Sequence, residues 1–434
     1  YYNQLAFTFG QDYGGKLDVI EGFAEVNVPL LAGQAWAKRL ELNGAIRQTR
    51  NKAHDKDPDN VLPPDVDTTK SVNFTSWKFS TIWDTTDWLR MRATRSRDMR
   101  AAGFRELFYK AVPTEEGTTQ GRVNNPFDGN SVDGTPILSA GNFGLVPEKA
   151  DTWTVGLVLS PGGAARGLRL SADWYEIRIK DAVASTGAQQ IVNFCHQGLG
   201  FCDRITFSDD TRTNITFIQA GQVNLGKFVS RGMDVELDYT LPLSRLGDWG
   251  KGTLHLRSMA TMNYDLRFQS APGASFIDYA GQTGVSAFAD FVNGPKWMLN
   301  NWLTYSLDRF STTLSVRHIP SAKFNVMWIG PDDPRYDALI QASYSDLTSA
   351  VPLNTVSDNT VSSRTYLGLS ASYKVPFGDA GGSWEIFGAI NNLLDKDPPF
   401  AAGGIAGPGT NYPTNPIYFD TQGAQFRAGV RVRF

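Results

Sequence analysis

The last ten residues, Gln425-Phe426-Arg427-Ala428-Gly429-Val430-Arg431-Val432-Arg433-Phe434, alternate between two kinds of side chain. Successive residues of a β-strand point to opposite faces of the sheet. One face of this segment therefore carries only apolar residues, and the other carries three arginines, a glutamine and a glycine. This pattern predicts a strand with an apolar medium on one side and water on the other.

The same kind of segment recurs along the whole chain. We predict an all-β protein of about 13 strands, because alternating stretches are separated by turn residues throughout. The predicted strands lie near residues 19–28, 38–50, 71–83, 88–96, 152–160, 167–180, 228–241, 252–262, 296–306, 310–319, 364–377, 383–393 and 422–434.

The connections between these strands alternate in length. Short turns join the pairs, and segments of roughly 20 to 55 residues separate one pair from the next; such long loops are uncommon in compact soluble domains. The long segments are 51–70, 97–151, 181–227, 263–295, 320–363 and 394–421. Outer-membrane barrels have short periplasmic turns and long extracellular loops. We therefore predict a transmembrane antiparallel β-barrel; a soluble sandwich or propeller is the alternative.

Charged side chains on the polar face of these strands are expected to line the lumen, because Arg or Lys at the lipid midplane costs about 2 to 4 kcal/mol. The strand after Arg231 carries its carboxylates in alternate positions, and the next strand carries a histidine and an arginine in the matching phase. The predicted lumen-lining residues are Arg90, Arg92, Asp234, Glu236, Asp238, His255, Arg257, Arg427 and Arg431.

Composition excludes other classes of protein. The 434 residues are 41% hydrophobic and 12% aromatic, and no stretch approaches the roughly 18 apolar residues that a spanning helix needs. The net charge of -3 provides no attraction for phosphates, which argues against nucleic-acid binding. The four histidines are scattered and no nucleophile or phosphate-loop motif occurs, so we expect no enzyme, no cofactor and no metal site. Whether loops bind calcium stays open, because residues 54–60 only begin like a calcium loop.

Several segments resemble the TonB-dependent outer-membrane receptors, in the order in which that family has them. Phe104-Arg105-Glu106-Leu107-Phe108 resembles the end of its "FRaPs..ELF" stretch, although the usual Pro is absent. Ser230-Arg231-Gly232-Met233-Asp234-Val235-Glu236 is similar to its "rGvE.e" strand start, and Asn392-Leu393-Leu394-Asp395-Lys396-Asp397-Pro398-Pro399 to its "NLfDk.PP" signature. The matches span roughly residues 70 to 434.

This resemblance implies a barrel of 22 strands with an N-terminal plug. Residues 1–434 would then be the C-terminal fragment of that barrel, without the plug, the TonB box and the signal peptide. A complete smaller barrel is the alternative. The terminal Phe434 resembles the signal that the barrel assembly machinery reads.

The resemblance also implies a function. Such receptors lie in the outer membrane of Gram-negative bacteria, in contact with its lipid, and take up a scarce ligand when the TonB-ExbB-ExbD complex transmits the proton gradient. The ligand implied for this chain is a ferric siderophore or an oligosaccharide. The sequence does not identify the ligand. A passive porin, or a surface adhesin, is the alternative. The expected ligand contacts are loop aromatics: Phe104, Tyr109, Tyr412, Tyr418 and Phe419.

Cys195 and Cys202 lie seven positions apart in the segment 181–227. In an exported protein, two such cysteines are expected to form a disulfide, because that compartment is oxidising. A metal site with His196 would have only three ligands at an unsuitable spacing.

Overall fold

The computed structural model describes residues 14–55, 69–109, 119–208, 210–269, 273–284, 293–345, 355–377, 382–400 and 414–433. Thirteen long strands dominate this part of the chain, one for each predicted strand, which confirms the all-β prediction. They are β1 (Gly15–Gln34), β2 (Ala37–Asp55), β3 (Thr69–Asp84), β4 (Leu89–Arg100), β7 (Glu148–Leu159), β8 (Leu168–Thr186), β10 (Ile215–Pro242), β11 (Thr253–Gln269), β13 (Trp297–Leu307), β14 (Phe310–Ile319), β17 (Arg364–Phe377), β18 (Gly382–Asn391) and β19 (Gln425–Arg433).

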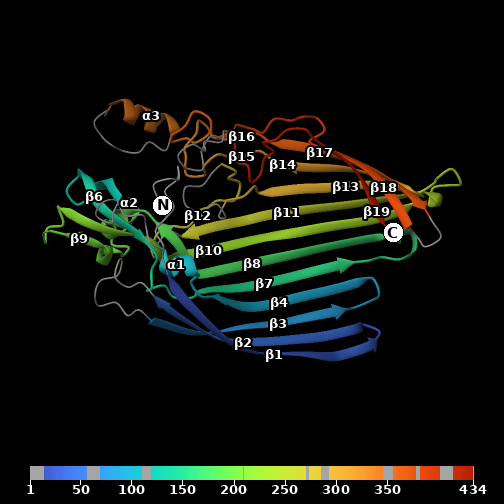
Figure 1. Cartoon of the computed structure of the whole chain (residues 1–434), viewed down its shortest axis with the longest axis horizontal. Coiled ribbons are helices and arrows are strands. Elements are labelled where there is room, and N and C mark those ends of the chain that lie inside the picture. The colour runs from blue at the N-terminus through green and yellow to red at the C-terminus, as the bar shows by residue number, and fades with distance from the viewer. Residues whose placement is uncertain are drawn as a thin grey trace.

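Each long strand pairs antiparallel with the next, so the strands form one continuous curved wall. Short turns gather at one edge of this wall and the long connections at the other (Figure 1). The predicted alternation of connections is therefore confirmed. Within the described residues no pairing joins β19 to β1.

The long connections contain secondary structure that the sequence pattern did not predict. Short strands and helices lie at the loop edge of the wall, on the left in Figure 1. They are α1 (Phe104–Phe108), β5 (Thr119–Asn125), β6 (Asn130–Ala140), α2 (Ala188–His196), β9 (Ile205–Phe207), β12 (Ile277–Asp278), β15 (Ala322–Lys323), α3 (Tyr336–Ser345) and β16 (Thr360–Val361). No helix in the described ranges is both long and apolar enough to cross a membrane.

Several wall strands reach farther toward the loop edge than predicted. The strand predicted over 228–241 begins at Ile215, and the one predicted over 167–180 continues to Thr186. Their added ends pair with each other and with the loop strands β6 and β9. The backbone pairing therefore extends beyond the residues in which apolar and polar side chains alternate.

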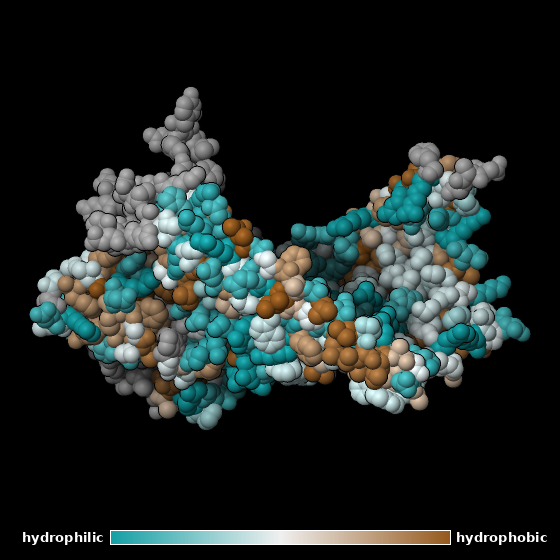
Figure 2. All heavy atoms as spheres, turned by 90° about the horizontal axis from the view of Figure 1, so that it is seen from below, coloured by the Kyte–Doolittle hydropathy of each residue, from teal (hydrophilic) through white to brown (hydrophobic). Residues whose placement is uncertain are grey.

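The two faces of the wall differ in polarity. Leu256, Leu303, Leu314 and Leu369 occupy directly opposed positions on four neighbouring strands, and Leu303 is 41% exposed. The adjacent row on the other face contains Asp238, Arg257, Trp302 and Ser315. From below, the molecule is hollowed between its ends, with apolar patches exposed beneath the hollow (Figure 2). One face therefore suits lipid, and the other suits an aqueous lumen.

Candidate functional site

Ion pairs cover the polar face of β4, β7 and β8. Arg92 on β4 donates two hydrogen bonds to Asp173 on β8, at 2.7 and 2.5 Å, although β7 lies between them. Gly156 stands at the crossing point, directly opposite both residues, and a Cβ there would overlap Asp173 Oδ1. Glycine at this position therefore lets one ion pair link two strands that are not neighbours.

A second group of ion pairs lies toward the short-turn edge. Asp84 accepts hydrogen bonds from Arg39 at 3.2 Å and from Arg90 at 2.6 Å, which connects β2, β3 and β4. On β10 and β11, Arg257 donates to Glu236 at 2.8 Å and His255 Nε2 lies 2.7 Å from Asp238. These charges satisfy one another, as the lining of a barrel requires.

The structure pairs the predicted lumen-lining residues only in part. The predicted partners on β10 and β11 do meet, whereas Arg90, Arg92 and Arg431 pair with Asp84, Asp173 and Glu385, which were not predicted. Asp234 and Arg427 form no ion pair within the described residues. Asp84 and Glu385 lie on strands adjacent to their partners, and Asp173 lies two strands from Arg92, so strand order was needed to find them. That these nine residues line an open lumen stays a prediction.

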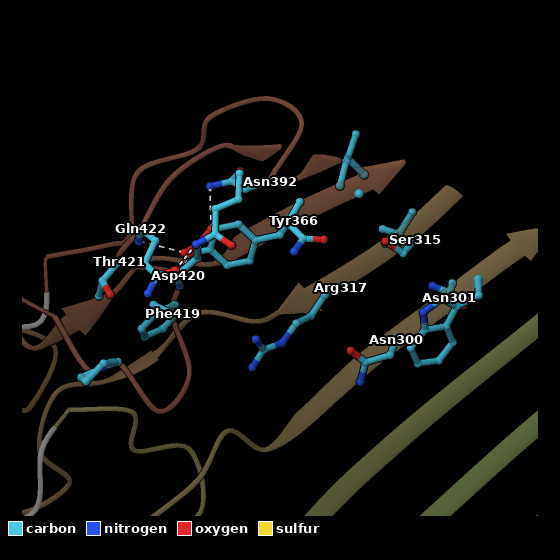
Figure 3. A pocket seen from close by; sticks show the side chains of 17 residues that line it. Asn300, Asn301, Ser315, Arg317, Tyr366, Asn392, Phe419, Asp420, Thr421 and Gln422 are labelled. Carbon is cyan, nitrogen blue, oxygen red and sulfur yellow. Dashed lines mark hydrogen bonds between the residues drawn. The ribbon is translucent and has the colours of Figure 1, made fainter. Parts of the chain in front are cut away.

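A pocket of about 490 Å³ opens on this face near the loop edge of β13, β14 and β17. Asn300, Arg317 and Tyr366 occupy directly opposed positions on the three strands and form its floor. The segment 419–422, from the connection between β18 and β19, lies across from them (Figure 3). Nothing in the sequence singled out this row, because its members come from two hairpins that are separated by a long connection.

Among the described residues of this pocket, the Arg317 guanidinium has no carboxylate partner. The Asp420 carboxylate accepts from Asn392 Nδ2 at 3.0 Å and from the Gln422 amide at 2.9 Å, while the Asp420 amide donates to Tyr366 Oη at 3.2 Å. Arg317 only approaches Met298 Sδ, at 3.9 Å, and pairs with no carboxylate among the described residues. A guanidinium beside amide side chains is suited to an anion or to a polar, oxygen-rich ligand.

The predicted ligand-contact aromatics lie in different environments. Phe104 is exposed in α1 and its ring is tilted by 50° against that of Phe108, with ring centroids 4.7 Å apart. The ring of Tyr109 lies 5.0 Å from the Arg105 guanidinium. Phe419 is only 2% exposed. Tyr418 donates to the Asn293 carbonyl at 2.7 Å, and burial raises the pKa of its phenol. Tyr412 and Phe434 lie outside the described residues. A contact between these aromatics and a ligand stays a prediction.

Cys195 and Cys202 are bonded to each other in the structure, with their Cα atoms 4.8 Å apart. The bond closes the turn after α2, whose apolar side chains pack into a core with parts of β5, β9 and β10. Buried members of this core are Val123, Ile191, Val192, Ile205, Ile215 and Ile218. The cysteine segment therefore belongs to a folded layer at the loop edge of the wall, the loop layer, made of α2 with parts of β5, β9 and β10.

The wall and its layer of loops define a class: a large antiparallel barrel of the outer-membrane type. Within that class, the chain belongs to the TonB-dependent receptor-like β-barrel family, whose model matches residues 2–393. This confirms the resemblance read from the motifs.

Solved structures share the fold at low sequence identity. A ferric enterobactin receptor from Pseudomonas aeruginosa is 14% identical, with a TM-score of 0.53 over 96% of this chain and 54% of that one. The copper transporter OprC is 14% identical, with a TM-score of 0.55 over 96% and 47% of the two chains. The siderophore receptor PirA from Acinetobacter baumannii is 13% identical, with a TM-score of 0.50 over 96% and 55%.

This chain thus spans about half the length of the solved structures that it matches. No curated protein matches it in sequence.

Proposed function

We propose that this chain forms part of an outer-membrane receptor that imports a scarce, oxygen-rich ligand, with energy delivered by TonB-ExbB-ExbD from the proton gradient. Membership of the TonB-dependent family supports the transport class and the outer-membrane location. The structural neighbours are named as receptors or transporters of ferric enterobactin, copper and siderophores, so a metal chelate is a reasonable ligand class.

The free guanidinium of Arg317 is the observation that favours an anionic ligand. It lies on the polar face, in a pocket whose one carboxylate, Asp420, is already hydrogen-bonded by Asn392 and Gln422. Ferric siderophores present anionic catecholate or hydroxamate oxygens, which a guanidinium binds through charge-assisted hydrogen bonds. A neutral oligosaccharide would use the amides but would depend less on Arg317.

Ligand uptake by cells that make the whole protein tests this proposal. Accumulation of a radiolabelled ferric siderophore should stop when a protonophore collapses the proton gradient. Arg317→Ala should weaken ligand binding by about 1.5 to 3 kcal/mol, the usual contribution of a hydrogen bond to a charged group. Arg309→Ala is the matched control, because it removes a cation from the short-turn end of the same hairpin.

Two results would contradict the proposal. Uptake that survives loss of the gradient would identify a passive porin instead. If the Arg317 and Arg309 variants bind the ligand equally well, the pocket is not part of the ligand pathway. Energised transport would then be tested by the protonophore experiment alone.

A further inference from the structure

The apolar face of the wall ends in charged rows near the loop edge. On β7 the outward residues run from Leu157 and Val155 through Trp153 to Asp151 and Lys149. On β8 they run from Ala172 through Trp174 to Glu176, Arg178 and Lys180. Tryptophan favours the interface between hydrocarbon and headgroups. The charges beyond it therefore lie at the level of the outer-leaflet headgroups.

Three lysines lie side by side in this region. Lys149 on β7 is directly opposite Lys180 on β8, and Lys180 is directly opposite Lys227 on β10. Lys180 and Lys227 are exposed, and none of the three forms an ion pair within the described residues. Like charges in directly opposed positions destabilise a sheet unless an anion lies between them.

Arginines lie next to this row of lysines, on the side toward the short-turn edge. Asp151 accepts from Arg97 at 2.8 Å and also pairs with Arg95, whose guanidinium lies 5.0 Å from the Trp153 ring. Asp151, Glu176 and Asp265 are each shared between two arginines. A fourth carboxylate, Asp278 on β12, is directly opposite Arg267. We call this region the outer cationic patch. Its members are Arg95, Arg97, Lys149, Arg178, Lys180, Lys227, Arg231 and Arg267, with the carboxylates of Asp151, Glu176, Asp265 and Asp278.

We infer that the outer cationic patch binds the phosphate of an outer-leaflet lipid headgroup. Among the described residues, eight basic side chains meet four carboxylates there, in a chain whose net charge is -3. The apolar belt formed by residues such as Val155 and Leu157 begins directly below, where acyl chains of the same lipid would lie. A free phosphate ion would use the lysines but not this belt. The inference rests on the proposed membrane location and is independent of ligand transport.

Binding of lipid to the whole protein tests this inference. The purified protein in detergent would be titrated with bis-phosphorylated lipid A and with the same lipid lacking both phosphates, and lipid adducts would be measured by native mass spectrometry. We expect preference for the phosphorylated lipid, and we expect Lys149→Gln/Lys180→Gln/Lys227→Gln to weaken its binding at least tenfold. The control Arg166→Gln/Lys251→Gln/Arg309→Gln removes three exposed cations from the short-turn edge and should bind as the unmodified protein does.

Three results would overturn the inference: equal affinity for the two lipids, an equal loss in both triple variants, or full displacement of the lipid by millimolar inorganic phosphate. Heat-modifiable gel mobility verifies that each variant has a folded barrel. If the triple variant does not fold, Lys180→Glu alone tests the middle of the row, and unchanged lipid binding by that variant would count equally against the inference. Measuring siderophore uptake in the same variants separates this site from the transport proposal, since the lipid site can fail while energised uptake persists.

Discussion

The wall and the loop layer cover their apolar side chains in different ways. In the wall, Val155 is 51% exposed on the outward face and charges pair on the other. In the layer around α2, Ile191 is 0% exposed and packs against other aliphatic residues. The wall needs lipid to cover its apolar side chains, whereas the loop layer buries its apolar side chains in a core of its own. The chain therefore combines a wall whose apolar face is exposed with a loop layer that has a small apolar core of its own. We expect mutations in the two parts to have different effects.

The largest effect is expected in the apolar core of the loop layer. Ile191→Ala removes a fully buried side chain and should destabilise this layer by about 2 to 5 kcal/mol, through lost burial and a residual cavity. Hydrogen exchange should show lower protection of the segment 188–218, with heat-modifiable mobility of the wall unchanged. Ile46→Ala, at an outward wall position that is already exposed, is the control. Equal loosening of wall and layer would mean that the two are one cooperative unit.

A charge on the apolar face should affect the wall instead. Val155→Arg is expected to cost about 2 to 4 kcal/mol, because the guanidinium would face hydrocarbon. Thr154→Arg is the control on the opposite face of the same strand, where charges are already paired. Less folded, heat-modifiable protein is expected in outer membranes for the first variant than for the second. Equal assembly of the two would refute the assignment of faces.

The smallest effect concerns the ion pair that crosses β7. Gly156→Ala should push Asp173 away from Arg92, at a cost of about 0.2 to 1 kcal/mol, because the pair is largely solvent-exposed. Gly388→Ala, where a Cβ has room, is the control. Urea unfolding of both variants, each also combined with Arg92→Ala, measures the coupling. If Gly156→Ala costs as much with Arg92 as without it, the crossing does not stabilise the wall.

The wall could be predicted from the sequence because it repeats one rule. Side chains at every second position, as in the strand from Gln425 to Arg433, report which face meets lipid and which meets water. Turn lengths then order the strands. The rule assigns a face to each side chain but does not say which side chains meet across strands. The bridge from Arg92 to Asp173 and the row of Asn300, Arg317 and Tyr366 therefore appear only once the strands are assembled.

The loop layer was harder to predict because its elements are short and depend on contacts between loops. One available signal was missed: Asp128-Gly129 is a typical hairpin turn, and it joins β5 to β6 with Gly129 at a φ of +78°. Phe419, an aromatic in a long loop, is buried and packs with Ile319 and Tyr366. Its predicted contact with a ligand stays a prediction. The composition of a loop predicts exposed side chains only where the loop forms no apolar core.

The pairing of β6 with β10 links two of the long connections. Residues Ile137 to Ala140 run parallel to Ile218 to Gly221, and the Asn125 side chain donates to the carbonyl oxygens of Arg212 and Thr213. The loop after β4 and the loop after β8 therefore share hydrogen bonds as well as apolar contacts. Neither can be transplanted onto a related barrel by itself. A loop-exchange chimera, or a surface antigen built from this region, would have to carry both segments together to keep its shape.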